Sequence, residues 1–116
     1  MEPIRSLIFF KRYFFDFYDN QTEKVKEKID YVLFLIRHIE QIPTKFLKHI
    51  EGTKGLYEVR IEYAGNIYRI FCCFDEGKIV ILLNGYQKKT QKALKGEIEK
   101  AVLIMGEYFT QKEEKR

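Results

Sequence analysis

The stretch that decides the fold is residues 56–92, LYEVRIEYAGNIYRIFCCFDEGKIVILLNGYQKKTQK. Its first part, residues 56–63, alternates apolar and charged side chains, a period of two that is typical of a strand with one buried face. The apolar face carries aromatic and branched residues, and the other face carries Glu58, Arg60 and Glu62. This segment therefore predicts a half-buried strand that presents its charges on a single face.

Two more strands follow within the same stretch. A glycine and an asparagine after residue 63 indicate a tight hairpin, because both residue types tolerate positive φ. The next strand spans Ile67 to Phe74 and carries Arg69 on the face opposite Tyr68. After a second turn signal, the apolar run from Lys78 to Leu83 is typical of a strand buried on both sides, and we interpret it as the central strand.

The segments before residue 56 predict another strand and a long helix. Ile4 to Phe10 has the apolar character of a first strand. Apolar residues at three- and four-residue spacing then predict a helix that begins near Asp19 or Asn20 and ends before Pro43. Residues 44–50 are interpreted as a short helical segment.

A second amphipathic period, from Ile98 to Phe109, predicts a C-terminal helix. The order of elements therefore predicts an α+β fold, a small and mostly antiparallel four-stranded sheet with N-terminal helices and a C-terminal helix packed on it. With 116 residues, of which 46% are hydrophobic and 33% charged, the chain fits one domain, residues 1–110, followed by a polar tail, residues 111–116.

The net charge and the cysteines indicate which partners and which cellular compartment to expect. A formal net charge of +4 and a pI near 9.0 permit an anionic partner without requiring one. Cys72 and Cys73 are adjacent in a strand and point to opposite faces, which argues against a mutual disulfide or a shared zinc site and indicates thiols of a reducing compartment. The N-terminal residues lack the apolar length of a signal peptide or a membrane span, so we expect a cytoplasmic protein.

Basic residues flank the three strands in the sequence. One group follows the third strand and the other precedes the first: Lys88, Lys89, Lys92 and Lys95, and Lys45, Lys48, His49 and Lys54. Cations mounted on neighbouring strands are well placed to bind an anion. Two alternatives stay open, because lysine runs are usually solvated surface and Arg60 can pair with Glu58 or Glu62 in a surface ion network.

Three motifs in this stretch resemble the RelE/ParE superfamily of bacterial toxins, and most closely its HigB-like, phage-derived branch. The motifs are LYEVR at residues 56–60, YRIF at 68–71 and GYQKKTQK at 85–92. Members of that branch typically show an L-Y-E-L-R strand, a Y-R-hydrophobic strand and an F-x-K-K-T-x-K segment. The resemblance therefore covers three ordered motifs and implies a RelE-like fold.

The resemblance implies a toxin of a type II toxin–antitoxin system that cuts mRNA on the ribosome. In such endoribonucleases the ribose 2′-hydroxyl attacks the adjacent phosphorus, and no metal or cofactor takes part. By position, Arg60 and Arg69 are implied as phosphate-binding catalytic residues, with Tyr86 stacking on a base or transferring a proton. RNA or ribosome contacts are expected from the lysines and the histidine named next: Lys88, Lys89, Lys92, Lys54, Lys48 and His49. The expected partner is an antitoxin, of helix-turn-helix type and encoded by the adjacent gene.

Some residues depart from the family pattern. Glu58 stands where the RelE branch has a lysine, so the proton acceptor stays unassigned. Lys92 is followed by alanine and leucine instead of threonine and proline. For His49 an exposed basic residue is the simpler interpretation. Two other functions stay open, a ParE-like inhibitor of DNA gyrase and a phage-derived binding protein of the same fold without activity.

Overall fold

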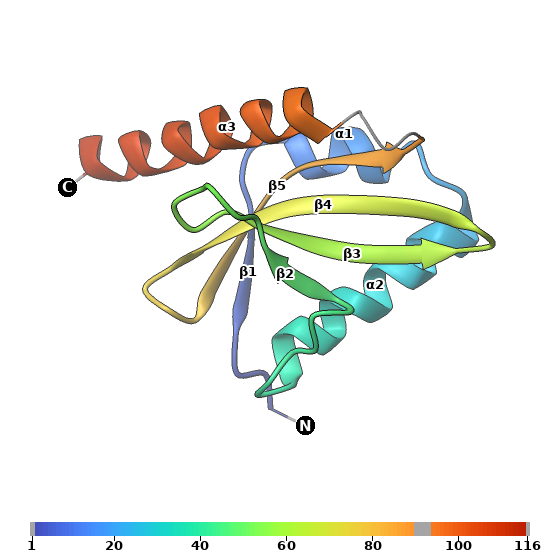
Figure 1. Ribbon diagram of the computed structural model, residues 1–116. Helices are drawn as coiled ribbons and strands as arrows, with labels where there is room; N and C mark the ends of the chain where they lie inside the picture. The colour runs from blue at the N-terminus through green and yellow to red at the C-terminus, as the bar shows by residue number, and fades with distance from the viewer. Residues whose placement is uncertain (1, 90–93, 116) are drawn as a thin grey trace.

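The structure, a computed structural model, describes residues 2–89 and 94–115 as a curved sheet with helices on both faces (Figure 1). In chain order the elements are β1 (Ser6–Phe9), α1 (Tyr13–Tyr18), α2 (Glu23–His38), β2 (Leu47–His49), β3 (Tyr57–Tyr63), β4 (Asn66–Asp75), β5 (Ile79–Lys88) and α3 (Leu94–Glu114). Within the described residues the sheet has five strands in the order β1-β5-β4-β3-β2. β1 is parallel to β5, and the other neighbours are antiparallel.

The α+β class is confirmed, but the sheet has five strands where four were expected. The additional strand is β2, which lies in the segment that we interpreted as a short helix. That segment is too short for a stable isolated helix, whereas the edge of β3 offers free backbone groups. The Arg60 N–H donates to the Phe46 carbonyl at 2.8 Å, and the Ile50 N–H donates to the Leu56 carbonyl at 2.9 Å. Pairing with a distant strand therefore decides the conformation here.

The hairpin predicted from the alternating pattern is present as β3 and β4. Its turn places Ala64 at φ 52° and Gly65 at φ 80°, the left-handed conformation that the glycine signal indicated. The middle strand of the sheet is β4, and the apolar run that we interpreted as central belongs to β5, between β4 and β1. β5 also continues to Lys88, past a bulge in its pairing with β4 near Ile70 and Cys72.

The N-terminal helical region differs from the prediction at both ends. A separate helix, α1, forms from the aromatic run at 13–18, and α2 begins only after Thr22, whose side chain accepts a hydrogen bond from the Val25 N–H at 3.3 Å. α2 ends at His38 and not near Pro43. The Arg5 guanidinium explains this end, because it donates to three carbonyls at 2.7–2.8 Å, those of Ile36, Ile39 and Glu40.

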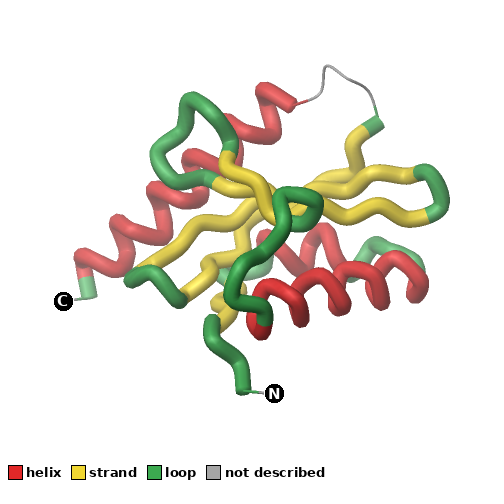
Figure 2. Tube along the Cα trace, turned by 60° about the horizontal axis from the view of Figure 1, so that its bottom comes forward, coloured by secondary structure: helices red, strands yellow, loops and turns green. Residues whose placement is uncertain are grey.

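The two faces of the sheet bury separate apolar clusters. α1 and α2 cover one face, and α3 lies on the opposite face (Figure 2). Cys72 belongs to the first cluster and Cys73 to the second, so the adjacent thiols do point to opposite faces, and both are free and buried. Burial raises the pKa of the Cys73 thiol to about 12, which keeps it protonated.

α3 extends beyond the expected end of the domain. The helix continues to Glu114, through residues that the sequence suggested as a polar tail. Asp75 of β4 holds this last part, since its carboxylate accepts hydrogen bonds from Tyr108 at 2.8 Å and from Lys112 at 2.8 Å. Among the described helices, none combines the length and the apolar character that a membrane span needs.

Candidate functional site

Arg60, Arg69 and Tyr86 lie in one row across three neighbouring strands. Arg60 on β3 is the cross-strand partner of Arg69 on β4, and Arg69 is the partner of Tyr86 on β5. Directly paired residues of a sheet have their side chains on the same face. The three residues that the sequence suggested as catalytic therefore share the face on which α3 packs, and we call them the Arg60–Arg69–Tyr86 row.

Glu58 connects the two arginines of the row. Its Oε1 lies 3.6 Å from the Arg60 Nε, and its Oε2 lies 3.7 Å from the Arg69 Nε. These distances are those of ion pairs and are longer than hydrogen bonds, so the guanidinium groups keep donors that an anion can use. One further donor of Arg69, Nη1, is taken by the Tyr68 carbonyl at 3.1 Å.

The row is half-exposed at Arg60 and buried at Arg69 and Tyr86. The Arg60 side chain is 32% exposed, whereas the Arg69 side chain is only 4% exposed. Burial lowers the pKa of Arg69, and the Glu58 carboxylate opposes that shift by favouring the charged form. Solvent, and any anion that enters from it, therefore reaches the row at its Arg60 end.

Tyr86 forms the buried end of the row. Its ring stacks on Phe71, with 5.7 Å between the ring centroids and 17° between the planes. The hydroxyl is buried and has no hydrogen-bond partner among the described residues, and the same holds for the Nε of Arg60. Burial, followed by the negative charge of Glu58, raises the pKa of Tyr86 to about 12. The phenol is therefore protonated at neutral pH and can donate a proton.

Two lysines flank the row on the same face. Lys48 on β2 is the cross-strand partner of Glu58, and Lys88 lies two residues beyond Tyr86 on β5. Both continue the positive charge on either side of the arginines. Two guanidinium groups, two ammonium groups and one carboxylate suit an anion and not a metal ion, which needs several acidic or neutral ligands.

The other predicted contacts lie elsewhere. His49 is paired with Tyr57 on the opposite face, where the two rings meet edge to face at 5.2 Å. Lys54 lines a groove between the loop before β3 and α3. Lys89 is exposed just beyond the end of β5, and Lys92 is outside the described residues.

The sequence from residue 16 to 105 matches the model of one protein family, described as phage derived protein Gp49-like (DUF891). The match covers most of the chain and contains the whole Arg60–Arg69–Tyr86 row. The chain belongs to the Gp49-like family. This is a family of RelE/ParE-like toxins, so the resemblance noted in the sequence is supported at the level of the superfamily. The chain has no match among curated proteins.

Two features of the site in this Gp49-like chain depend on contacts between distant segments. The role of Glu58 as the shared partner of both arginines depends on the β3–β4 register, which the alternating pattern of one strand does not fix. Lys28 of α2 and Lys45 lie on either side of a pocket at the edge of β3. The sequence gave no signal that these two lysines line one pocket, since this depends on how α2 packs against β3.

Proposed function

We propose that this chain is the toxin of a type II toxin–antitoxin system, of the HigB-like branch, and that it inhibits translation by cutting mRNA on the ribosome. The observation that supports this proposal is the row of two arginines and one tyrosine on a rigid sheet. Phosphoryl chemistry of this kind depends on positioning and on stabilising negative charge, which strand-mounted arginines supply. Membership of a toxin family supports the same proposal.

The proposed reaction has four parts. The 2′-oxygen of one ribose bonds to the adjacent phosphorus, and the bond from that phosphorus to the 5′-oxygen breaks. Arg60 and Arg69 bind the phosphate oxygens and stabilise the added negative charge. Glu58 is the carboxylate in contact with both arginines, and it accepts the proton of the 2′-hydroxyl. Tyr86 donates its proton to the departing 5′-oxygen.

These roles require Glu58 to exchange its partners. In the free protein the carboxylate lies between the two guanidinium groups. A phosphate that enters at the exposed Arg60 end competes with the carboxylate for the same donors. Displacement frees Glu58 to act as a base beside the bound phosphate. In the absence of RNA, Glu58 thus remains the counterion of the two guanidinium groups, of which that of Arg69 is buried.

We also infer a protein antitoxin, of helix-turn-helix type and encoded by the adjacent gene. Arg60, Lys48 and Lys88 place positive charge along one face, and this charge attracts acidic segments of a partner. Antitoxin binding over this face weakens as salt is added, because the charges are at the surface. Growth arrest on expression of the chain alone, with rescue by the neighbouring gene, is the expected result. Normal growth with the chain expressed alone contradicts the proposal.

The activity is tested by translation of a reporter mRNA, followed by primer extension. Wild-type protein is expected to produce new 5′ ends within the coding sequence, and Arg69→Ala is expected to leave the transcript intact. Arg12→Ala, which removes an exposed arginine at the N-terminal boundary of α1, is the matched control and retains cleavage. Intact transcripts with inhibited gyrase supercoiling would assign the chain to the ParE-like branch. Intact transcripts with neither effect would leave a binding protein without activity.

A further inference from the structure

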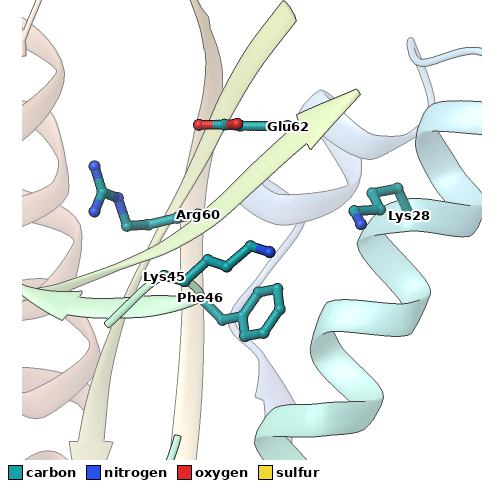
Figure 3. A pocket seen from close by; sticks show the side chains of 5 residues that line it. All are labelled: Lys28, Lys45, Phe46, Arg60 and Glu62. Atoms are coloured by element: carbon teal, nitrogen blue, oxygen red, sulfur yellow. The ribbon is translucent and has the colours of Figure 1, made fainter. Parts of the chain in front are cut away.

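A pocket of 190 Å³ lies at the edge of the sheet, between β3 and α2. It is lined by Lys28, Lys45, Phe46, Arg60 and Glu62 (Figure 3). β2 pairs with β3 only along residues 57–59, and one further hydrogen bond joins Arg60 to Phe46. The remaining part of β3 therefore has an open edge, and the pocket lies beside it.

Two lysines converge on this pocket from different elements. Lys45 extends towards α2, and Lys28 extends from α2 towards it (Figure 3). Neither ammonium group has a carboxylate within ion-pair distance among the described residues. Other lysines of α2 differ, since Lys24 pairs with Glu27 at 3.6 Å and Lys26 with Glu23 at 3.8 Å. The pocket lining thus has three cations and one carboxylate, that of Glu62, and the described residues form no ion pair with either lysine.

Aromatic rings accompany both lysines. The Lys28 ammonium lies 5.4 Å from the centre of the Tyr31 ring, and the Lys45 ammonium lies 5.4 Å from the centre of the Phe46 ring. Tyr31 is 51% exposed, and Phe34, one helical turn further along α2, is 48% exposed. A half-exposed ring beside a cation, as at Tyr31, is typical of surfaces on which unpaired bases stack. Phe34 stacks on the His38 ring, with 4.1 Å between the ring centroids, and its exposed part extends this aromatic surface.

We propose that this edge is a second phosphate-binding subsite, for single-stranded RNA, with Tyr31 and Phe34 as stacking surfaces for its bases. The inference rests on the proposed function and extends it, because Arg60 belongs both to the row and to the pocket lining. The Arg60 guanidinium and the Glu62 carboxylate point to the other side of β3 from the two lysines (Figure 3). An RNA strand bound at Arg60 therefore passes around the open edge of β3 to reach Lys28 and Lys45.

An acidic protein segment is the competing occupant, because an open strand edge also accepts an extended chain. RNA is favoured by the exposed Tyr31 ring beside Lys28 and the exposed Phe34 ring one turn further along α2, which a peptide does not require. It is also favoured by continuity with the arginines of the row. The two occupants differ in what they contact, and a binding measurement separates them.

The test uses a single-stranded 2′-O-methyl oligouridine of about 12 nucleotides, a length within the range of single-strand sites. This probe lacks the attacking hydroxyl, so its binding is independent of cleavage. For a single strand, the slope of log affinity against log salt changes by about 0.7 for each phosphate that the protein neutralises. The Lys28→Gln/Lys45→Gln double variant is expected to make the slope shallower by about 1.4. Lys24→Gln, on the same helix but paired with Glu27, leaves the slope nearly unchanged.

Tyr31→Ala and Phe34→Ala separate stacking from charge. Each is expected to weaken oligouridine binding about fivefold or more without changing the salt slope. An unchanged slope in the lysine double variant overturns the proposal. So does a double variant that loses binding to polyglutamate while it keeps binding to oligouridine, since the edge would then take an acidic protein chain. If the protein cleaves mRNA but the lysine double variant binds oligouridine with an unchanged salt slope, only the second subsite is refuted. If the expected oligouridine binding is found but the protein does not cleave mRNA, only the nuclease activity is refuted.

Discussion

Arg60 and Arg69 lie directly opposite each other on β3 and β4, and two oxygens of one carboxylate, that of Glu58, approach their Nε atoms. Two like charges in a directly paired position destabilise a sheet unless an opposite charge compensates them. Glu58 provides that charge from two residues before Arg60, on the same face of β3. A phosphate can replace the Glu58 carboxylate, because it is also negatively charged and has more oxygens to accept hydrogen bonds from the two planar guanidinium groups.

Replacement of Glu58 by glutamine tests this compensation. Glu58→Gln keeps the shape of the side chain but leaves the two guanidinium groups without a counterion, one of them buried. We expect the free energy of unfolding to fall by about 2 kcal/mol, measured by urea denaturation at neutral pH. Glu62→Gln is the matched control on the same strand and face, and it changes stability by less than about 0.5 kcal/mol because Glu62 is exposed. Equal effects of the two variants would contradict the role of Glu58.

Removal of the Tyr86 hydroxyl separates catalysis from stability. Tyr86→Phe retains the ring that stacks on Phe71 and deletes a buried hydroxyl with no hydrogen-bond partner among the described residues. Stability is expected to stay constant or to rise by about 1 kcal/mol. Cleavage of mRNA is expected to fall by about 100-fold or more, as for the loss of a general acid. A Tyr86→Phe protein with full cleavage activity would exclude proton donation by this residue.

High pH should weaken the fold through one buried phenol, that of Tyr86, and two half-buried ones, those of Tyr18 and Tyr108. Burial is the largest cause that raises the pKa of Tyr18, Tyr86 and Tyr108 to about 12, whereas tyrosines in the unfolded chain titrate near 10. Because the folded protein retains protons that the unfolded chain loses, the stability that these groups contribute is complete below about pH 10. It then decreases as the pH rises to about 12. Urea unfolding between about pH 10 and about pH 12 measures this decrease. The Tyr86→Phe variant should lose less unfolding free energy per pH unit than the wild type. An identical slope in that variant would show that Tyr86 does not take part.

Replacement by alanine is expected to have opposite effects on stability at two glycines, Gly85 and Gly106. A Cβ atom at Gly85 would lie 2.7 Å from a ring carbon of Phe17, because α1 packs closely on β5 at this point. Gly85→Ala is therefore expected to destabilise the protein by about 1–3 kcal/mol. Gly106 lies inside α3 with open space around it, so Gly106→Ala is expected to stabilise by about 1 kcal/mol. Thermal unfolding of the two variants checks both signs, and a stable Gly85→Ala protein would contradict the close packing of α1.

The sequence predicted best the elements whose pattern is local. The alternation at residues 57–63 placed Glu58 and Arg60 on one face, because the buried face of the strand carries apolar residues and the other face carries charged ones. β2 was missed because its three residues become a strand only through bonds to β3. α1 was missed because an almost continuous aromatic run has no helical period to detect.

In the candidate site, too, features with a local pattern were predicted and those that depend on distant contacts were not. The position of Arg69 on its strand followed from periodicity, whereas Tyr86 was implied only by the family resemblance and lies on β5 beyond the expected end of that strand at Leu83. The alignment of the two residues in one row also required the register of β4 with β5 and the bulge within it. The convergence of Lys28 and Lys45 on one pocket depended on the packing of α2 against the sheet edge. Contacts between distant segments were therefore the part that the sequence did not predict.

The role of the Arg60–Arg69–Tyr86 row is tested most directly by cleavage of an mRNA on programmed ribosomes, with the Arg60→Ala variant beside the wild type. Arg60 is suited to this comparison because its side chain is one of the less buried members of the row, at 32% exposed, so its removal should leave the fold intact. We expect fragments with 5′-hydroxyl ends from the wild-type protein, and a loss of these fragments with Arg60→Ala. Intact mRNA after incubation with the wild-type protein, or equal cleavage by the two proteins, would contradict the assignment of the row as the site of RNA cleavage.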